Sequence, residues 1–186
     1  MEKVKVLNTG ENALPSESTP KSSAKDIRAN VSLINRELIF NADIKTVHKT
    51  VKTGFLPDRY PDIVDTKSLV KALVILPGGR ALIPSGLYMQ LPEGHSMDVR
   101  PRSGLALKYG LEIVNSPGLI DEDYRGDVGI IVKNGGDRSI IIIDGERIAQ
   151  IKLVKDVPFE WDSVTTKEEL SDTVRGEGGF NSTGTK

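Results

Sequence analysis

Hydrophobic and polar residues alternate in many short runs along this chain, and Gly, Pro and Asp-Gly pairs separate the runs. A period of two predicts β-strands with one buried face. Two such runs, Lys3–Leu7 and Ala24–Ser32, lie in the first part of the chain. A denser series follows: Leu73–Leu76, Arg80–Ile83, Leu87–Leu91, Met97–Arg100, Leu111–Val114, Asp127–Lys133, Ile140–Ile143 and Ile148–Val154. Short strands at this spacing predict an all-β fold, either a barrel or a sandwich.

One segment departs from this pattern and predicts a short helix, Ser103–Tyr109. Ser103 has the chemistry to cap its N-terminus, and Gly110 has the backbone freedom to end it. After Trp161 the chain becomes polar, and it ends in a glycine-rich segment at 175–184. That segment has too little apolar surface to join a core, so we expect a mobile tail.

The composition narrows the class of protein. With 186 residues, of which 38% are hydrophobic, the chain is long enough for one domain with a buried core. A net charge of -1 argues against nucleic acid or a membrane surface as a partner. Cysteine is absent, which excludes disulfides and cysteine-based zinc sites. Because no apolar run approaches about 20 residues and no apolar leader opens the chain, we expect a cytoplasmic or other intracellular protein.

The segment from Asn115 to Gly126 stands out between two predicted strands. Pro117 and Gly118 stand near its start, an acidic cluster follows, and Gly126 closes it. A chain folded back here would place an apolar side, two backbone edges and a carboxylate in one concavity. Such a concavity binds a flat, hydrogen-bonding ring and supplies a base beside it. The alternative interpretation is an ordinary acidic hairpin loop.

Three further segments have the chemistry to hold phosphate. Arg102-Ser103-Gly104 opens the predicted helix, where free N–H groups favour an anion. Gly145–Gln150 places a Gln on a strand after a turn, and the tail offers Arg175 with closely spaced backbone N–H groups. The structural alternatives are a core ion pair for Arg102, a plain strand residue for Gln150 and a disordered linker for the tail. Phe180 has no core to join there, so it either extends into solvent or covers a flat ring.

Taken in order, these segments resemble the five motifs of the trimeric dUTPase family, the deoxyuridine triphosphate nucleotidohydrolases. The corresponding segments are Ser22–Ala29, Pro101–Ala106, Asn115–Gly126, Gly145–Gln150 and Arg175–Gly184. The resemblance covers residues 73–186 well and 1–32 loosely. It implies a jelly-roll-like β-barrel with one short helix, in a single domain over 1–170 with a flexible C-terminal lid at 171–186. It also implies a homotrimer with active sites between subunits.

The resemblance implies a reaction, in which dUTP and water give dUMP and pyrophosphate. Asp121 would act as the general base that takes a proton from the attacking water, a role that suits a carboxylate ionised at neutral pH. The uracil edge would meet Asn115 and the backbone of Leu119 and Ile120, Tyr124 would stack under the deoxyribose, and Gly129 would lend a backbone contact. Phosphate ligands would be Arg102, Ser103, Gly104 and Gln150, with Arg175, Ser182, Thr183 and Gly184 on the γ-phosphate. Phe180 would stack on the uracil when the tail closes.

The resemblance also implies Mg²⁺, chelated by the three phosphates and keeping several waters. Asp26 would reach this ion only through water. The chain departs from the family pattern at Ala24, where a Gly is usual before Asp26, and at Asn181, where a Gly usually follows Phe180.

The stretch from about Leu33 to Leu69 has no counterpart in the family pattern, which crosses from Ala29 to Pro77 over a much shorter distance. We expect an insertion that leaves the barrel surface, because a barrel tolerates long loops better than extra residues within its ladder. Three interpretations stay open: a hairpin arm that packs on a neighbouring subunit, a surface for an unknown protein partner, or a cover over the barrel.

Two other functions remain as hypotheses. A dCTP deaminase of the same superfold usually lacks this glycine-rich tail and places a glutamate where Asp121 stands. A dUTPase-like regulatory binder would use the insertion as its partner surface, and the intact Asp121, Tyr124 and Phe180 argue against a loss of catalysis.

Overall fold

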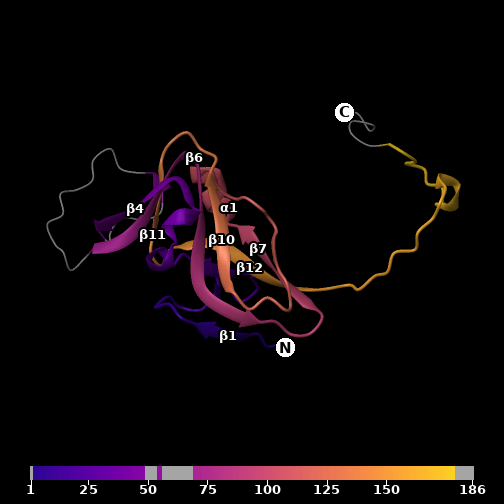
Figure 1. Ribbon diagram of the computed structural model, residues 1–186, viewed down its shortest axis with the longest axis horizontal. Coiled ribbons are helices and arrows are strands. Elements are labelled where there is room, and N and C mark those ends of the chain that lie inside the picture. The colour runs from indigo at the N-terminus through magenta and orange to yellow at the C-terminus, as the bar shows by residue number, and fades with distance from the viewer. Residues whose placement is uncertain (1, 49–53, 56–68, 179–186) are drawn as a thin grey trace. The chain divides into compact units, whose positions relative to one another are not determined.

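The computed structural model of the protein describes residues 2–48, 54–55 and 69–178. The chain forms two compact units, residues 1–156 and 157–186, and each is described here by itself. In the first unit the strands form two antiparallel sheets (Figure 1). Within the described part of the chain, no helix is long and apolar enough to cross a membrane.

The larger sheet is built on one long strand, β6 (Leu69–Gln90), which runs through the first unit in Figure 1. Its strand order is β5-β11-β6-β10-β8, and β1 and β4 pair with β6 off this path. The bounds of its other strands are β1 (Lys5–Asn8), β4 (Ile39–His48), β5 (Gly54–Phe55), β8 (Leu111–Ile113), β10 (Asp127–Asn134) and β11 (Ile140–Ile143).

The smaller sheet has the order β2-β3-β12-β7-β9. Its strands are β2 (Ser16–Glu17), β3 (Lys25–Arg28), β7 (His95–Pro101), β9 (Gly118–Ile120) and β12 (Arg147–Lys155). The three central strands, β3, β12 and β7, carry segments that are far apart in the sequence.

Inward-facing side chains of both sheets form one core. Ile27, Val99 and Ile151 come from the smaller sheet, and Ile83 and Ile130 from the larger one, all of them buried. Full burial of such a side chain stabilises a fold by about 1.5–3 kcal/mol. The alternation in the sequence therefore identifies the buried face of each strand.

The predicted all-β class with one short α-helix is confirmed for the described residues. The strands form two sheets in a jelly-roll-like arrangement and not a closed barrel. Most predicted strands between 97 and 154 lie within one or two residues of the observed bounds.

One strand prediction was wrong, because the three runs expected between Leu73 and Leu91 form the single strand β6. Gly78, Gly79 and Gly86 suggested turns, but they lie near points where the register of the strand pairing shifts. The pairing of β4 with β6 shifts register between Phe40 and Ala42, and a Cβ on Gly79 would lie 2.3 Å from the backbone oxygen of Asn41. A bulge and a close backbone approach need glycine as much as a turn does.

The predicted helix is present as α1 (Ser103–Tyr109). Gly110 ends it in the left-handed region with φ 68°, and its N–H bonds to the carbonyl of Ala106. The expected cap at Ser103 was wrong, because Arg102 occupies the N-cap position without a side-chain capping bond.

Part of the insertion joins the sheet. Strand β4 pairs antiparallel with β6 from Ile39 opposite Ala81 to His48 opposite Leu69, and the guanidinium of Arg80 lies 4.4 Å from the ring centre of Phe40. The expectation that the whole segment leaves the surface was therefore wrong. Strand β6 has an edge opposite β11 and β10, and a strand added at an edge leaves the other ladder intact. Residues 49–53 and 56–68 lie outside the described residues.

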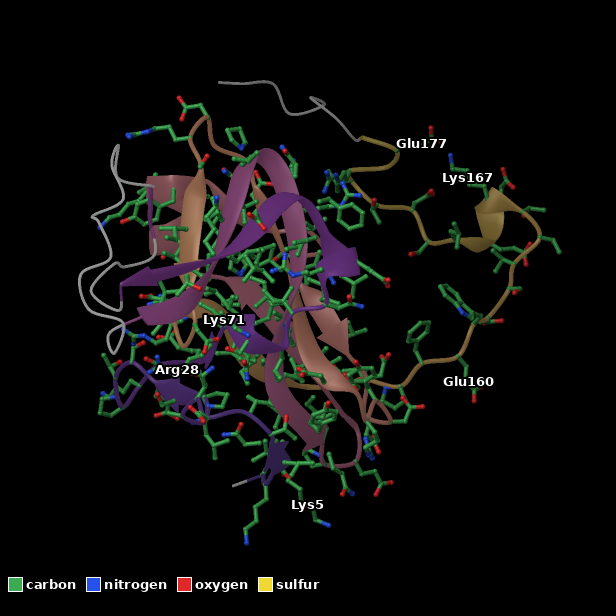
Figure 2. The ribbon with its side chains drawn as sticks, turned by 60° about the vertical axis from the view of Figure 1, so that its left-hand side comes forward. Lys5, Arg28, Lys71, Glu160, Lys167 and Glu177 are labelled. Carbon is green, nitrogen blue, oxygen red and sulfur yellow. The ribbon has the colours of Figure 1, made fainter. Side chains whose placement is uncertain are left out.

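The second unit is described from 157 to 178. A short 3-10 helix, η4 (Lys167–Glu169), begins with a capping box between Thr166 and Glu169. A hydrogen bond from the Thr165 hydroxyl, with backbone bonds from Thr166 and Thr165, lowers the pKa of the Glu169 carboxyl. Lys167 forms an ion pair with Glu177, and Figure 2 shows the two side chains in this unit.

Candidate active site

Three neighbouring strands bring together residues of the first, second and fourth motif segments. Asp26 on β3 lies opposite Gln150 on β12, and Ala149 on β12 lies opposite Pro101 at the end of β7. Arg102 follows Pro101 directly. The sheet register therefore places a carboxylate, an amide and a guanidinium side by side.

The Asp26 carboxylate is the centre of this group, and its side chain is only 1% exposed. One oxygen, Oδ1, lies 3.3 Å from Arg102 Nε and accepts a hydrogen bond from Gln150 Nε2 at 3.2 Å. The other, Oδ2, accepts from Arg147 Nη1 at 3.0 Å and from Ser18 Oγ at 3.2 Å. A buried carboxylate needs such partners, because burial of an unpaired charge costs several kcal/mol.

The turn before β12 sets the position of Arg147. Gly145 has φ 82°, which favours glycine, and its N–H bonds to the carbonyl of Ala29 at 2.9 Å. Arg28 Nη1 donates to the carbonyl of Gly145 at 2.7 Å, and the N–H of Asp144 bonds to the carbonyl of Lys71 at 3.0 Å. Figure 2 labels Arg28 and Lys71 in the first unit. These bonds fix the start of the strand that carries Arg147 and Gln150.

A polar cavity of about 380 Å³ opens beside this group. Its lining residues are Arg102, Ser103, Gly104, Leu105, Lys108, Tyr109, Glu146 and Gln150. Beside the one carboxylate, Glu146, the lining offers two cationic side chains, two hydroxyls and an amide as donors, which suit an anion such as a phosphate chain. The predicted phosphate residues Arg102, Ser103, Gly104 and Gln150 thus line one cavity.

The acidic segment takes a different place. Strand β9 pairs with β7, with Leu119 opposite Asp98, and the loop that follows exposes Asp121 to solvent. The N–H of Tyr124 bonds to the carbonyl of Asp121 at 3.2 Å and closes a turn. Neither Asp121 nor Tyr124 lines the phosphate-sized cavity.

Asp127, which the sequence alone did not single out, supports this loop. Its backbone oxygen accepts a hydrogen bond from the Tyr124 hydroxyl at 2.9 Å, and its carboxylate accepts from the N–H groups of Ser85 and Gly86 at 3.0 and 3.1 Å. A Cβ on Gly126 would lie 2.3 Å from the Tyr124 hydroxyl. Gly126 therefore lets the tyrosine side chain fold back onto the main chain.

The remaining predicted residues are dispersed. Asn115 lies at the start of the acidic segment and Gly129 on β10, where a Cβ would lie 2.7 Å from Leu82 Cδ1. Arg175 belongs to the second unit, where its Nε donates to the carbonyl of Gly178 at 2.9 Å. Phe180, Ser182, Thr183 and Gly184 lie outside the described residues.

Residues that the sequence interpretation missed are Ser18, Lys108, Glu146 and Arg147. Glu146 and Arg147 had a signal, because both stand inside the fourth motif segment, Gly145–Gln150. Ser18 reaches Asp26 only because β2 folds beside β3, which the sequence does not encode locally.

No group of three or more His, Cys, Asp or Glu side chains that would hold a metal ion occurs in residues 2–48, 54–55 and 69–178. Both carboxylate oxygens of Asp26 are in contact with protein donors. The described residues therefore offer no dedicated metal cage.

The two sheets and the cationic cavity define the class, an all-β protein with a site for an anionic ligand. A sequence profile of the dUTPase family matches residues 65–184. The deoxyuridine 5'-triphosphate nucleotidohydrolase of Roseobacter denitrificans is 50% identical over 112 residues, which are 60% of this chain and 72% of that enzyme. The enzyme of the same name from Chlamydia pneumoniae is 48% identical over 117 residues, 63% of this chain and 79% of that enzyme. The chain belongs to the dUTPase family.

Solved structures of phage dUTPases share the fold. A variant of the Staphylococcus bacteriophage 80alpha dUTPase, determined with dUpNHpp, has a TM-score of 0.67 at 22% sequence identity and covers 99% of each chain. The dUTPase from phage phi11 of S. aureus, which carries a species-specific insert, has a TM-score of 0.60 at 19% identity and covers 90% of this chain and 99% of that one. At these identities the likeness establishes the fold alone.

Proposed function

We propose that the protein hydrolyses dUTP to dUMP and pyrophosphate. The observation that carries this proposal is the single cavity lined by Arg102, Ser103, Gly104 and Gln150, in a chain about half identical to named dUTP hydrolases over the aligned region. Membership of the dUTPase family disfavours the deaminase hypothesis.

The cavity residues bind the phosphate chain. Arg102 supplies a planar, permanently charged group, and Ser103 and Gln150 add neutral donors. Contacts with Asp26 hold both Arg102 and Gln150 in the folded chain, and the backbone oxygen of Arg147 also holds Arg102, so less ordering is needed on binding.

The acidic loop supplies the base. Asp121, exposed directly after β9, takes a proton from the water that attacks the α-phosphorus, and the electron pair of the breaking P–O bond leaves with pyrophosphate. Asn115 and the backbone of Leu119 and Ile120 bind the uracil edge. Tyr124 lies under the deoxyribose, where a ribose 2′-hydroxyl would clash.

Complete sites form between copies of the chain in a homotrimer. The separation of Asp121 and Tyr124 from the phosphate cavity supports this arrangement, because one copy then supplies the base-binding loop and another the phosphate residues. The tail adds Arg175, Phe180, Ser182, Thr183 and Gly184 as a lid that excludes water.

Magnesium would be held by the three phosphates of the substrate rather than by protein side chains. The ion neutralises charge on the phosphates when it is bound. The prediction that Asp26 reaches the ion through water fits poorly with a carboxylate whose oxygens already meet Ser18, Arg102, Arg147 and Gln150.

A surface for an unknown protein partner is one of the three interpretations that stay open for residues 33–69. Strand β4 supports this only by its position, because it pairs with β6 on one side within the described residues and leaves its other edge without a strand.

The test is release of pyrophosphate from dUTP, dTTP, dCTP and UTP, each with and without Mg²⁺. Rapid turnover of dUTP alone is the expected result, and the Mg²⁺ arms measure the metal dependence directly. Ammonia release from dCTP, or equal turnover of all four nucleotides, would contradict the proposal.

A further inference from the structure

We propose that Arg147 is a positioning residue for phosphate binding, acting through Asp26 on Arg102 and Gln150. This inference rests on the proposed function for the identity of the ligand. Its first support is that Arg147 forms an ion pair with Asp26 and does not line the cavity itself.

The two oxygens of the Asp26 carboxylate contact different residues. Its Oδ1 faces the two cavity residues, Arg102 and Gln150, at 3.3 and 3.2 Å. Its Oδ2 faces Arg147 and Ser18, at 3.0 and 3.2 Å. Three hydrogen bonds and one ion pair therefore hold this carboxylate, which has about four acceptor positions. Arg147 therefore fixes the plane of the carboxylate that orients both phosphate ligands.

Arg147 also holds Arg102 directly through its main chain. Arg102 Nη1 donates to the backbone oxygen of Arg147 at 2.7 Å, while its Nε lies against Asp26. Two anchor points set the plane of the guanidinium. The other terminal nitrogen has no protein partner among the described residues and is left for a phosphate oxygen.

The contacts of the Asp26 carboxylate with Ser18, Arg102, Arg147 and Gln150 indicate that it acts on the protein's own donors. The magnesium requirement therefore should not change when Arg147 is replaced, whereas the geometry of the phosphate ligands should.

Burial distinguishes Arg147 from a core residue. Its side chain is 46% exposed, whereas that of Asp26 is 1% exposed. Replacement of Arg147 thus removes an ion-pair partner of the buried Asp26 carboxylate and leaves the hydrophobic core packed. The pair Arg100–Asp98 on β7 offers a matched control, because Arg100 is 50% exposed and Asp98 is 12% exposed, at a distance of 2.6 Å. Arg100 does not line the cavity.

The experiment compares the wild type with Arg147→Gln, Arg147→Lys and Arg100→Gln by calorimetric titration with dUpNHpp and with dUMP. We expect Arg147→Gln to weaken dUpNHpp binding about tenfold and dUMP binding less than about threefold, because a misplaced anchor affects the phosphate chain most. Arg147→Lys keeps the charge and should recover part of the loss, and Arg100→Gln should bind both ligands as the wild type does. Kinetics with dUTP should show a raised KM for Arg147→Gln and an unchanged half-saturating Mg²⁺ concentration.

Equal affinity of Arg147→Gln and the wild type for dUpNHpp would overturn the inference, and so would an equal loss for dUpNHpp and dUMP. If the wild type binds dUpNHpp but releases no pyrophosphate from dUTP, the proposed function fails while the binding comparison still tests Arg147. Absence of dUpNHpp binding by the wild type would overturn both.

Discussion

The phosphate cavity and the acidic loop are built in opposite ways. Around Asp26, contacts from three adjacent strands converge on a carboxylate that is 1% exposed. Asp121 instead is exposed on a loop whose turn is closed by a backbone bond from Tyr124. The difference indicates that the cavity residues are held in place within the folded chain, whereas under the proposed function Asp121 would be covered only by substrate and a neighbouring copy.

The largest expected effect separates chemistry from binding. Asp121→Asn removes the base but changes no described packing contact, so turnover of dUTP should fall by about 10²–10⁴-fold. Affinity for dUpNHpp should stay within about threefold of the wild type, measured by titration. A loss of affinity for dUpNHpp as large as the loss of turnover would show that Asp121 also contributes to ligand binding.

The second prediction concerns stability on the other side of the comparison. Asp26→Asn leaves Arg102 and Arg147 facing a neutral group in a buried place, and it should cost about 3–5 kcal/mol of unfolding free energy. Denaturant titration measures this cost. Asp121→Asn is the matched control on the exposed loop, with an expected change within about 0.5 kcal/mol. Similar losses of unfolding free energy for the two variants would contradict the difference between the buried Asp26 and the exposed Asp121.

A smaller effect is expected where the loop meets the larger sheet. Asp127→Ala leaves the N–H groups of Ser85 and Gly86 without the carboxylate, which should cost about 1–3 kcal/mol. It should also raise the KM for dUTP, because loss of the carboxylate contacts loosens the residue whose backbone oxygen accepts a hydrogen bond from the Tyr124 hydroxyl. Thermal unfolding and initial rates measure the two effects, with the exposed Asp123→Ala as control. An unchanged melting temperature for Asp127→Ala would contradict the supporting role.

The smallest prediction concerns the turn at Glu169 in the second unit. Hydrogen bonds from Thr165 and Thr166 lower the pKa of this carboxyl, so the turn gains stability above the ordinary range of a glutamate and loses it as pH falls through the lowered value. NMR shifts of residues 165–170 should move toward unfolded values in acid. Glu169→Gln should remove that dependence, and an unchanged acid transition in this variant would contradict the assignment.

The alternation in the sequence predicted several strands that have one buried face, but the strand expected over Ala24–Ser32 ends at Arg28. The alternation over Ile148–Val154 and Asp127–Lys133 follows the sheet faces, because a one-residue slip would expose the core side chains. It failed in β6, where Pro77, Gly78 and Gly86 suggested turns. Bulges and close backbone approaches require the same residues, and only the partner strands distinguish the two uses.

The candidate site was predictable as a set of segments but not as a set of contacts. Arg102 and Gln150 were predicted from their chemistry, and the structure places both on the cavity. The support from Ser18 and Arg147 depends on the pairing of β2, β3 and β12, which is long-range in the sequence. Likewise, strand β4 pairs with an edge of β6, and the local sequence pattern does not indicate that this edge is available for pairing.

The central claim is that one copy of the chain supplies the acidic loop and another supplies the phosphate cavity. The direct test is pyrophosphate release from dUTP by Asp121→Asn and Arg102→Ala, each inactive alone, after they are unfolded and refolded together in equal amounts. The account predicts recovery of about a quarter of the wild-type activity, because one site in four then combines an intact loop with an intact cavity. A mixture as inactive as its two components would contradict it.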